Sequence, residues 1–240
     1  MLVVFHPELH PIFEVIGYSV GFAVYRRGRK QHGDFLADER RWMVTAAAAV
    51  WALVGSRVLG LLEQMPQTGW QWINLLKPGG KTIVGGLLGG WIAVELVKWF
   101  AGTTKRTGDL FALPLCVGIA IGRIGCFLAG MADDTYGRAT TLVWGVDFGD
   151  GVRRHPTQIY EVGFLVGLGW LLWSYHARPH RNGRVFRLFM AAYLGWRLAI
   201  DFLKPQPLIG GMNAIQWACL AGLIALGFGE LSRKQEALRV

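Results

Sequence analysis

The sequence predicts an all-α integral membrane protein with about seven transmembrane helices and a small cap on the outer side. The first observation behind this fold class is the low charge, since only 17% of the 240 residues are charged, against about 25% in soluble domains. The second is that 52% of the residues are hydrophobic. The third is that apolar stretches recur at about the 20-residue length that crosses a bilayer. Together they exclude a disordered chain and argue against a soluble globular protein.

Seven apolar stretches are expected to span the membrane. They comprise residues 11–25, 42–62, 82–100, 110–131, 158–175, 185–203 and 211–231. The first is short and could instead lie at the membrane interface. No internal repeat is apparent, and the opening MLVVFHPELH lacks the basic residues of a cleavable signal peptide. We therefore expect residues 1–240 to form a single polytopic membrane domain.

The Lys and Arg residues between these stretches predict the orientation. Sixteen of them lie on one side of the predicted spans and six on the other. Because cytoplasmic loops carry the excess of Lys and Arg, we expect the N-terminus outside and the C-terminus in the cytoplasm. The net charge of +9 is thus mainly a topology signal, and nucleic-acid binding is not expected. Three arginines remain inside the spans, namely Arg57, Arg123 and Arg197.

Two longer connections lie on the predicted outer side. Residues 132–157 form the expected cap, in which the alternation over 141–148 indicates a short strand. Residues 63–81 contain Trp70 and Trp72, which are typical of an aromatic belt at the membrane interface.

Several charged residues within the spans share one depth, near the outer leaflet. They are Glu14, Arg57, Arg123, Glu161, Arg197 and Asp201. Ionisable groups in hydrocarbon are costly and usually face a bundle interior or an aqueous cavity. Arginine suits phosphate because its planar guanidinium donates two hydrogen bonds at once, so we expect a site for an anionic headgroup. The alternative is a set of interior salt bridges that lock the bundle, and the i, i+4 spacing of Arg197 and Asp201 would allow such a pair.

Other features are expected to be structural. Glycines four residues apart within the spans allow helices to pack closely. These pairs are Gly85/Gly89, Gly86/Gly90, Gly118/Gly122 and Gly163/Gly167. Glu95 and Lys98 are expected to pair near the inner end of their span. The three cysteines cannot form a complete disulfide framework, and no Cys or His spacing indicates a metal site.

Two motifs go beyond the general properties of a helical bundle. Residues 121–130 read IGRIGCFLAG, and residues 155–161 read HPTQIYE. With YLGWRLAIDF at 193–202 and Gln216, they resemble the prolipoprotein diacylglyceryl transferase family over nearly the whole chain. The resemblance implies a multi-pass enzyme of the bacterial inner membrane that uses phosphatidylglycerol or another anionic phospholipid. It would move the diacylglyceryl group to the lipobox cysteine thiol of a preprolipoprotein, with no metal or organic cofactor.

The resemblance also assigns site residues. Arg123 and Arg197 match arginines of the family motifs and are expected to stabilise the charge of the leaving glycerol phosphate. Val84 stands where the family has a histidine, Cys126 replaces an asparagine, and Asp201 takes the place of a glutamate. The residues expected to bind substrate are Glu14, Tyr18, Arg57, Gly85, Gly86, Cys126, Tyr136, Gly137, Tyr160, Glu161 and Asp201.

More than one interpretation fits the general base, and the same is true of the function class. Since Val84 cannot accept a proton, the base is expected to be His155 or the pair Asp133 and Asp134. Cys126 lies one turn from Arg123, so its thiol could carry a covalent lipid intermediate, although a small packing residue is the default. Other readings are a related headgroup reaction with another acceptor and a non-catalytic lipid-binding membrane protein. A transporter is not expected, because no paired broken helices appear.

Overall fold

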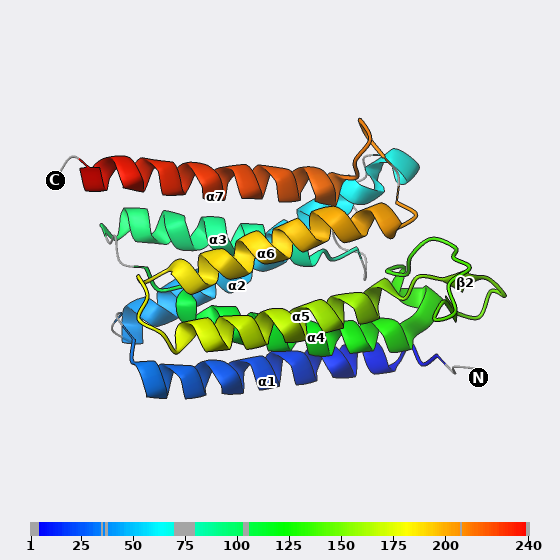
Figure 1. The fold of residues 1–240 in the computed structure, drawn as a ribbon, viewed down its shortest axis with the longest axis horizontal. Coiled ribbons are helices and arrows are strands. Elements are labelled where there is room, and N and C mark those ends of the chain that lie inside the picture. Colours follow the sequence, from blue (N-terminus) through cyan, green and yellow to red (C-terminus); the bar gives the residue numbers. More distant parts are fainter. Residues whose placement is uncertain are drawn as a thin grey trace. The chain divides into compact units, whose positions relative to one another are not determined.

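The computed structural model describes residues 5–34, 36, 38–69, 80–102, 106–206 and 208–238. Seven α-helices lie within these residues and coincide with the seven apolar stretches, so the all-α prediction is confirmed (Figure 1). The helices are α1 (Leu9–His32), α2 (Asp38–Thr68), α3 (Ile83–Phe100), α4 (Asp109–Ala129), α5 (Thr157–His176), α6 (Arg184–Ile200) and α7 (Ala214–Leu238). Trp70 and Trp72 lie outside the described residues.

Helix α1 is longer than the apolar stretch that predicts it. It has 24 residues and continues through a basic segment, with Arg29, Lys30 and His32 in its last turn. Cations are favourable there because a helix dipole places partial negative charge at the C-terminus. Hydropathy alone therefore predicts the end of this helix too early in the sequence.

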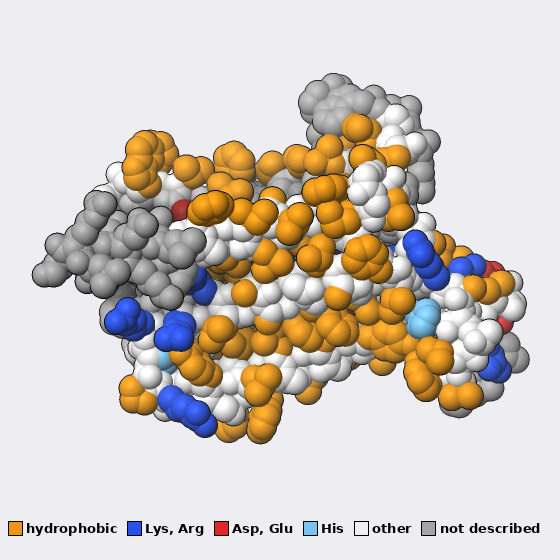
Figure 2. All heavy atoms as spheres, turned by 45° about the horizontal axis from the view of Figure 1, so that its top comes forward, with side chains coloured by type: hydrophobic (Ala, Val, Ile, Leu, Met, Phe, Trp, Pro, Cys, Tyr) orange, Lys and Arg blue, Asp and Glu red, His pale blue; other side chains and the backbone are white. Residues whose placement is uncertain are grey.

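Within the described residues, three helical segments are long and apolar enough to cross a membrane. They are Glu39–Pro66, Ile83–Phe100 and Asp109–Asp133, and Ala214–Gly229 is a shorter apolar helix. Hydrophobic side chains cover much of the visible surface along the helices (Figure 2). Large ones such as Val15, Trp99 and Trp170 are 63%, 74% and 64% exposed. These helices are those of a membrane protein, because an aqueous surface seldom carries so many large apolar groups.

The contacts of the chain cluster into two compact units. The first comprises residues 1–34, 106–189 and 203–205, and the second residues 35–105, 190–202 and 206–240. In the first unit α4 packs along both α1 and α5. In the second unit α2 and α3 form the most extensive helix pair.

Glycines bring helix backbones into direct contact within each unit. A Cβ atom added to Gly85 or Gly89 of α3 would clash with the backbone carbonyl of Gly55 or Trp51 in α2. A Cβ atom on Gly17 of α1 would lie 2.7 Å from the carbonyl oxygen of Gly118 in α4. The predicted packing role is therefore confirmed for Gly85, Gly89 and Gly118, whereas Gly17 was not among the predicted pairs.

Not every glycine pair packs in this way. A Cβ atom on Gly163 or Gly167 would meet no described atom within 4 Å. The same spacing thus marks a helix contact only where a neighbour lies on that face. The predicted pair in α3 forms as well, since Lys98 Nζ lies 3.0 Å from Glu95 Oε1.

The cap follows α4 through the 3-10 helix η2 (Gly130–Asp133). Strand β1 (Val146–Asp147) pairs antiparallel with β2 (Arg153–Arg154), with Val146 opposite Arg154. The strand expected over 141–148 is therefore present but short, because a turn closed by the Gly145 N–H and the Leu142 carbonyl precedes it. Phe148, only 3% exposed, has a ring contact with Phe127 of α4, which anchors the cap.

Candidate functional site

A buried ion pair joins α4 and α5 in the first unit. Arg123 Nε lies 2.9 Å from Glu161 Oε2, and the two side chains are 6% and 2% exposed. The two helices pack along each other, which brings these residues from the two sequence motifs together. Loss of either partner would leave an uncompensated buried charge, which costs about 3–5 kcal/mol. A phospholipid that contacts Arg123, as predicted, would therefore meet a guanidinium that the Glu161 carboxylate already orients.

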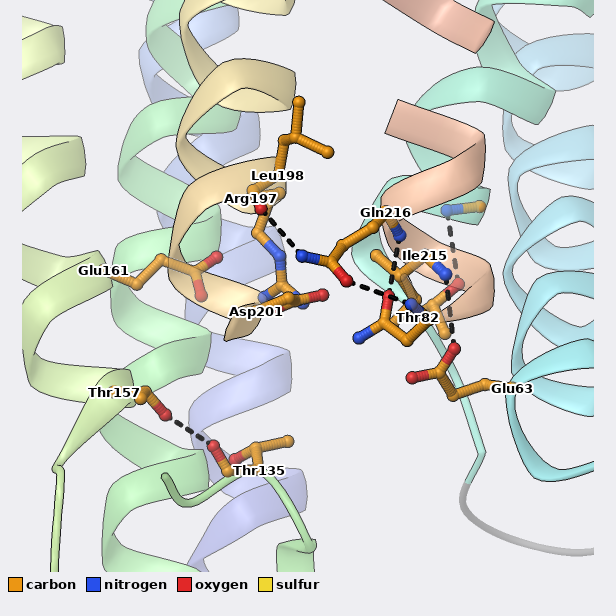
Figure 3. A network of polar contacts seen from close by, with 12 residues as sticks. Glu63, Thr82, Thr135, Thr157, Glu161, Arg197, Leu198, Asp201, Ile215 and Gln216 are labelled. Carbon is orange, nitrogen blue, oxygen red and sulfur yellow. Dashed lines mark hydrogen bonds and ion pairs between the residues drawn. The ribbon is translucent and has the colours of Figure 1, made fainter. Parts of the chain in front are cut away.

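The first turn of α5 fixes the position of Glu161. Thr157 Oγ1 donates a 2.7 Å hydrogen bond to the Thr135 carbonyl, which ties this turn to the cap (Figure 3). Thr157 and Glu161 are four residues apart and share a helix face. Between them, Gln158 is only 1% exposed, and neither its Nε2 nor its Oε1 has a hydrogen-bond partner in the described part of the chain. Such a buried amide is a candidate to contact a ligand.

The predicted base His155 belongs to a chain of three polar rings at the cap. Trp144 Nε1 donates a 2.8 Å hydrogen bond to the Tyr160 hydroxyl. The same hydroxyl lies 3.3 Å from His155 Nδ1. Tyr160 and His155, which come from one motif, are therefore in contact, and Trp144 is a third member that the motif does not contain.

A second cluster at the end of α4 contains Cys126 and Asp133. His10 Nδ1 lies 3.1 Å from Asp133 Oδ1, and His10 Nε2 lies 3.9 Å from Cys126 Sγ. Arg123 Nη1 lies 3.8 Å from the same sulfur. His10 was not predicted as a site residue, because 116 residues separate it from Cys126 and no local spacing signals the contact.

The two candidate carboxylates of the cap differ in their surroundings. The Asp133 side chain is 8% exposed and accepts a 2.5 Å hydrogen bond from Thr135. Asp134 is exposed and adopts a left-handed conformation with φ 54°. Of the two, Asp133 is therefore the one placed among other site residues.

Tyr136 and Gly137 line the base of the cap. The Arg154 guanidinium lies 5.0 Å from the Tyr136 ring centroid, a cation–π contact. Desolvation raises the pKa of the Tyr136 phenol, and the neighbouring Asp134 carboxylate raises it further. The Gly137 N–H donates a 2.9 Å hydrogen bond to the His155 carbonyl, and a Cβ atom there would lie 2.6 Å from His155 Cβ. Gly137 thus allows the backbone to approach His155 closely.

Arg197 and Asp201 form a buried ion pair in the second unit. Arg197 Nη2 lies 2.8 Å from Asp201 Oδ1 and 3.1 Å from Oδ2. Their side chains are 4% and 0% exposed. The i, i+4 pairing is confirmed, although Asp201 begins the 3-10 helix η3 (Asp201–Leu203) after α6 has ended.

Two buried side-chain amides at the start of α7 bond to backbone groups, one of which is the Leu198 carbonyl in α6. Gln216 Nε2 donates a 3.0 Å hydrogen bond to the Leu198 carbonyl. Asn213 and Gln216 cap the helix reciprocally, with side-chain to backbone distances of 2.7 and 2.9 Å. Glu63 Oε2 accepts a hydrogen bond from the Ile215 N–H at 3.2 Å (Figure 3). Of these residues, only Gln216 was indicated by the sequence.

The other expected site residues have mixed surroundings. In the second unit, Arg57 is half-buried on α2, and Gly85 donates its N–H to Thr82 Oγ1 at 3.2 Å. Gly86 is more loosely packed, because a Cβ atom there would lie 3.5 Å from the Ala52 carbonyl oxygen. Val84 is 1% exposed. Packing against α2 therefore accounts for Gly85 without a ligand.

Two expected residues come from α1. Glu14 Oε1 lies 3.8 Å from His10 Nε2, so Glu14 borders the cluster of Cys126 and Asp133. Tyr18 is 70% exposed. The structure thus brings Glu14 toward the other site residues of its unit and places Tyr18 on the outer surface of its helix.

Comparison with known proteins gives one consistent family. The profile of the prolipoprotein diacylglyceryl transferase family matches residues 5–229. A phosphatidylglycerol–prolipoprotein diacylglyceryl transferase of Bordetella parapertussis is 33% identical over 254 residues, with 92% of this chain and 94% of the relative covered. A protein of the same name from Polynucleobacter asymbioticus is 34% identical, with 78% and 75% covered. The chain therefore belongs to the prolipoprotein diacylglyceryl transferase family.

Proposed function

We propose that the protein transfers the diacylglyceryl group of phosphatidylglycerol to the cysteine thiol of a prolipoprotein. The observation that carries this proposal is the pair of buried arginines, Arg123 and Arg197, each held by a carboxylate and each within a family motif. The name of its relatives, which match most of this chain, supports the same donor and acceptor. We further infer seven spans, an outer N-terminus and location in the bacterial inner membrane.

The reaction needs charge stabilisation and a deprotonated thiol. The acceptor sulfur attacks the glyceryl carbon that bears the phosphate, so an S–C bond forms and the C–O bond breaks. Glycerol phosphate leaves with the bonding electron pair and gains a negative charge. Arginine suits phosphate because its planar guanidinium donates two hydrogen bonds at once, so Arg123 and Arg197 are the proposed contacts of the leaving phosphate. Loss of a preorganised donor of this kind costs about 10²- to 10³-fold in rate.

The proton of the acceptor thiol must leave before or during attack, because the thiolate is the nucleophile. His155 and Asp133 remain the proposed acceptors of this proton. His155 contacts the hydroxyl of Tyr160, which would fix the orientation of its ring. Asp134 is less suited to this role because its side chain is exposed and neighbours Tyr136.

The buried amide of Gln158 is proposed to bind a polar group of the donor lipid. It lies on the same helix as Glu161, three residues before it, and both are almost fully buried. A polar group that is unpaired in the folded protein gains more from a ligand than one that must first break a bond.

The test is an assay of purified protein with phosphatidylglycerol vesicles and a lipobox peptide, with product mass as the readout. We expect the peptide to gain one diacylglyceryl group. Arg123→Ala should reduce transfer at least about 100-fold, and Arg123→Lys should not restore it, because Lys lacks the forked donors. Arg153→Ala is the matched control, since Arg153 is an exposed cap arginine.

Two results would count against the proposal. Normal transfer by a folded Arg123→Ala protein would remove Arg123 from the mechanism. Binding of the lipid without transfer to any thiol peptide would favour the lipid-binding alternative.

A further inference from the structure

One turn of the cap is both apolar and exposed. Residues 142–145 form this turn, which a 2.9 Å hydrogen bond from the Gly145 N–H to the Leu142 carbonyl closes. Leu142, Val143 and Trp144 are 37%, 85% and 56% exposed. A single exposed apolar residue needs no explanation, whereas a contiguous exposed group marks a contact with a membrane or with another protein. The turn is therefore a candidate contact surface.

The charged residues of the cap lie in its other half. Residues 139–146 read ATTLVWGV and contain no charged residue, whereas residues 147–154 read DFGDGVRR and contain four. The connection between β1 and β2 holds Asp150, which forms an ion pair with Arg154. The cap thus has one apolar turn and one charged turn. Such a division suits a segment that lies at the boundary between hydrocarbon and water.

A hydrogen bond ties the apolar turn to the start of α5. Trp144 Nε1 donates a 2.8 Å hydrogen bond to the Tyr160 hydroxyl, and Tyr160 lies in the first turn of α5. Trp and Tyr are enriched at membrane interfaces, because their rings are apolar while their N–H and O–H groups find polar partners. The bond therefore holds the turn beside the point where α5, one of the proposed spans, begins.

The exposed face of α5 continues the same apolar surface. Four large apolar side chains of this helix are at least 42% exposed. They are Ile159, Val166, Trp170 and Trp173, spaced by seven, four and three residues. This spacing places them on one face of the helix. Ile159 directly precedes Tyr160, so the apolar face reaches the residue that holds the turn.

We propose that the apolar turn of residues 142–144 inserts into the adjacent lipid leaflet and anchors the cap to the membrane surface. Lipid is the occupant that the structure favours, because the turn bears no charge and continues the apolar face of α5. Leu142 and Val143 would enter the boundary of the acyl chains, while the Trp144 N–H keeps its partner. That this leaflet is the outer one rests on the proposed orientation, whereas insertion does not depend on the transferase reaction.

Insertion is tested with an environment-sensitive fluorophore on the full-length protein in vesicles of phosphatidylcholine and phosphatidylglycerol. Val143→Cys carries the label, and Asp150→Cys is the matched control, because Asp150 is exposed in the charged turn. The three native cysteines are buried, so the unsubstituted protein serves as the labelling blank. We expect a nitroxide on the acyl chains to quench the label at 143 and aqueous iodide to leave it unquenched. The label at 150 should show the reverse.

A second variant separates the behaviour of the turn from that of the fluorophore. Leu142→Asp places a charge in the turn, so the label at 143 should lose its lipid quenching, since charged groups are disfavoured in hydrocarbon. Unchanged lipid quenching in the folded variant would show that the fluorophore inserts by itself and would overturn the anchor.

Two other outcomes also overturn the anchor. Equal iodide quenching at 143 and 150 would mean that the apolar turn lies in water or that the charged turn is buried as well. Protection of 143 from iodide without lipid quenching would mean that protein covers the turn, as in contact with a second copy. None of these measurements requires transfer activity, so their results are independent of the proposed transferase function.

Discussion

Two buried glutamines offer a sharp comparison, because they are equally buried but differ in their hydrogen bonds. Gln158 and Gln216 are 1% and 0% exposed. The Gln216 side chain makes two hydrogen bonds, of 3.0 Å to the Leu198 carbonyl and 2.9 Å from the Asn213 N–H. Gln158 makes none within the described residues. Replacing each by Met, which has a similar length and no amide, should therefore destabilise the protein at position 216 but not at position 158.

The magnitudes follow from the bonds lost. Gln216→Met removes both hydrogen bonds to backbone groups, of which the one from the Asn213 N–H is buried. At about 1–3 kcal/mol for a buried group left unpaired and about 1 kcal/mol for the other bond, the free energy of unfolding should fall by about 2–4 kcal/mol. Gln158→Met removes an unpaired amide and should leave the free energy of unfolding unchanged or raise it by up to about 3 kcal/mol. Equilibrium unfolding in detergent, followed by circular dichroism, measures both changes. In the transfer assay, Gln158→Met should nevertheless raise KM for phosphatidylglycerol.

The reasoning would be refuted if Gln158→Met destabilised the protein as much as Gln216→Met does. That result would mean that the Gln158 amide is paired within the folded protein, and it would remove the reason to assign it a ligand. Unchanged KM in a stable Gln158→Met protein would leave the unpaired amide in place but separate it from the donor lipid.

Three further predictions concern packing, capping and ionisation. Gly89→Ala should cost about 1–3 kcal/mol by overpacking against α2, whereas Gly163→Ala should gain up to about 1 kcal/mol from helix propensity; equal stabilities would contradict the contact. Asn213→Ala should cost about 1 kcal/mol in chemical denaturation through loss of the α7 cap, and no change would show that the cap is not needed. Asp134→Asn should lower the raised pKa of Tyr136 toward about 10, measured as tyrosinate absorbance against Tyr136→Phe. An unchanged titration would mean that desolvation alone raises the pKa.

The sequence predicted those parts of the fold that depend on local patterns. Hydropathy located the seven helices of the described residues because each of them contains a run of apolar residues, which is visible in the sequence without knowledge of its neighbours. The Arg197–Asp201 pair was foreseeable since four residues on one helix bring side chains together. The end of α1 was not, because a basic last turn stabilises a helix that hydropathy would end at residue 25.

Contacts between distant segments could not be predicted from the sequence. Nothing in the spacing of His10 indicates that it meets Cys126, since the contact depends on how α1 packs along α4. The pairing of Arg123 with Glu161 likewise depends on the packing of α4 against α5. Arg123 and Glu161 were both expected at the site, but their spacing along the chain does not indicate that they pair with each other.

The glycine contacts between helices have a consequence for access to the hydrocarbon of the bilayer. Where the backbones of α2 and α3 touch through Gly55, Gly85 and Gly89, no space is left for an acyl chain to pass between them. The contact of Gly17 with the Gly118 carbonyl oxygen closes the seam between α1 and α4 in the same way. A lipid tail that reaches Arg123 or Arg197 from the side must therefore enter along a helix face other than these two glycine seams.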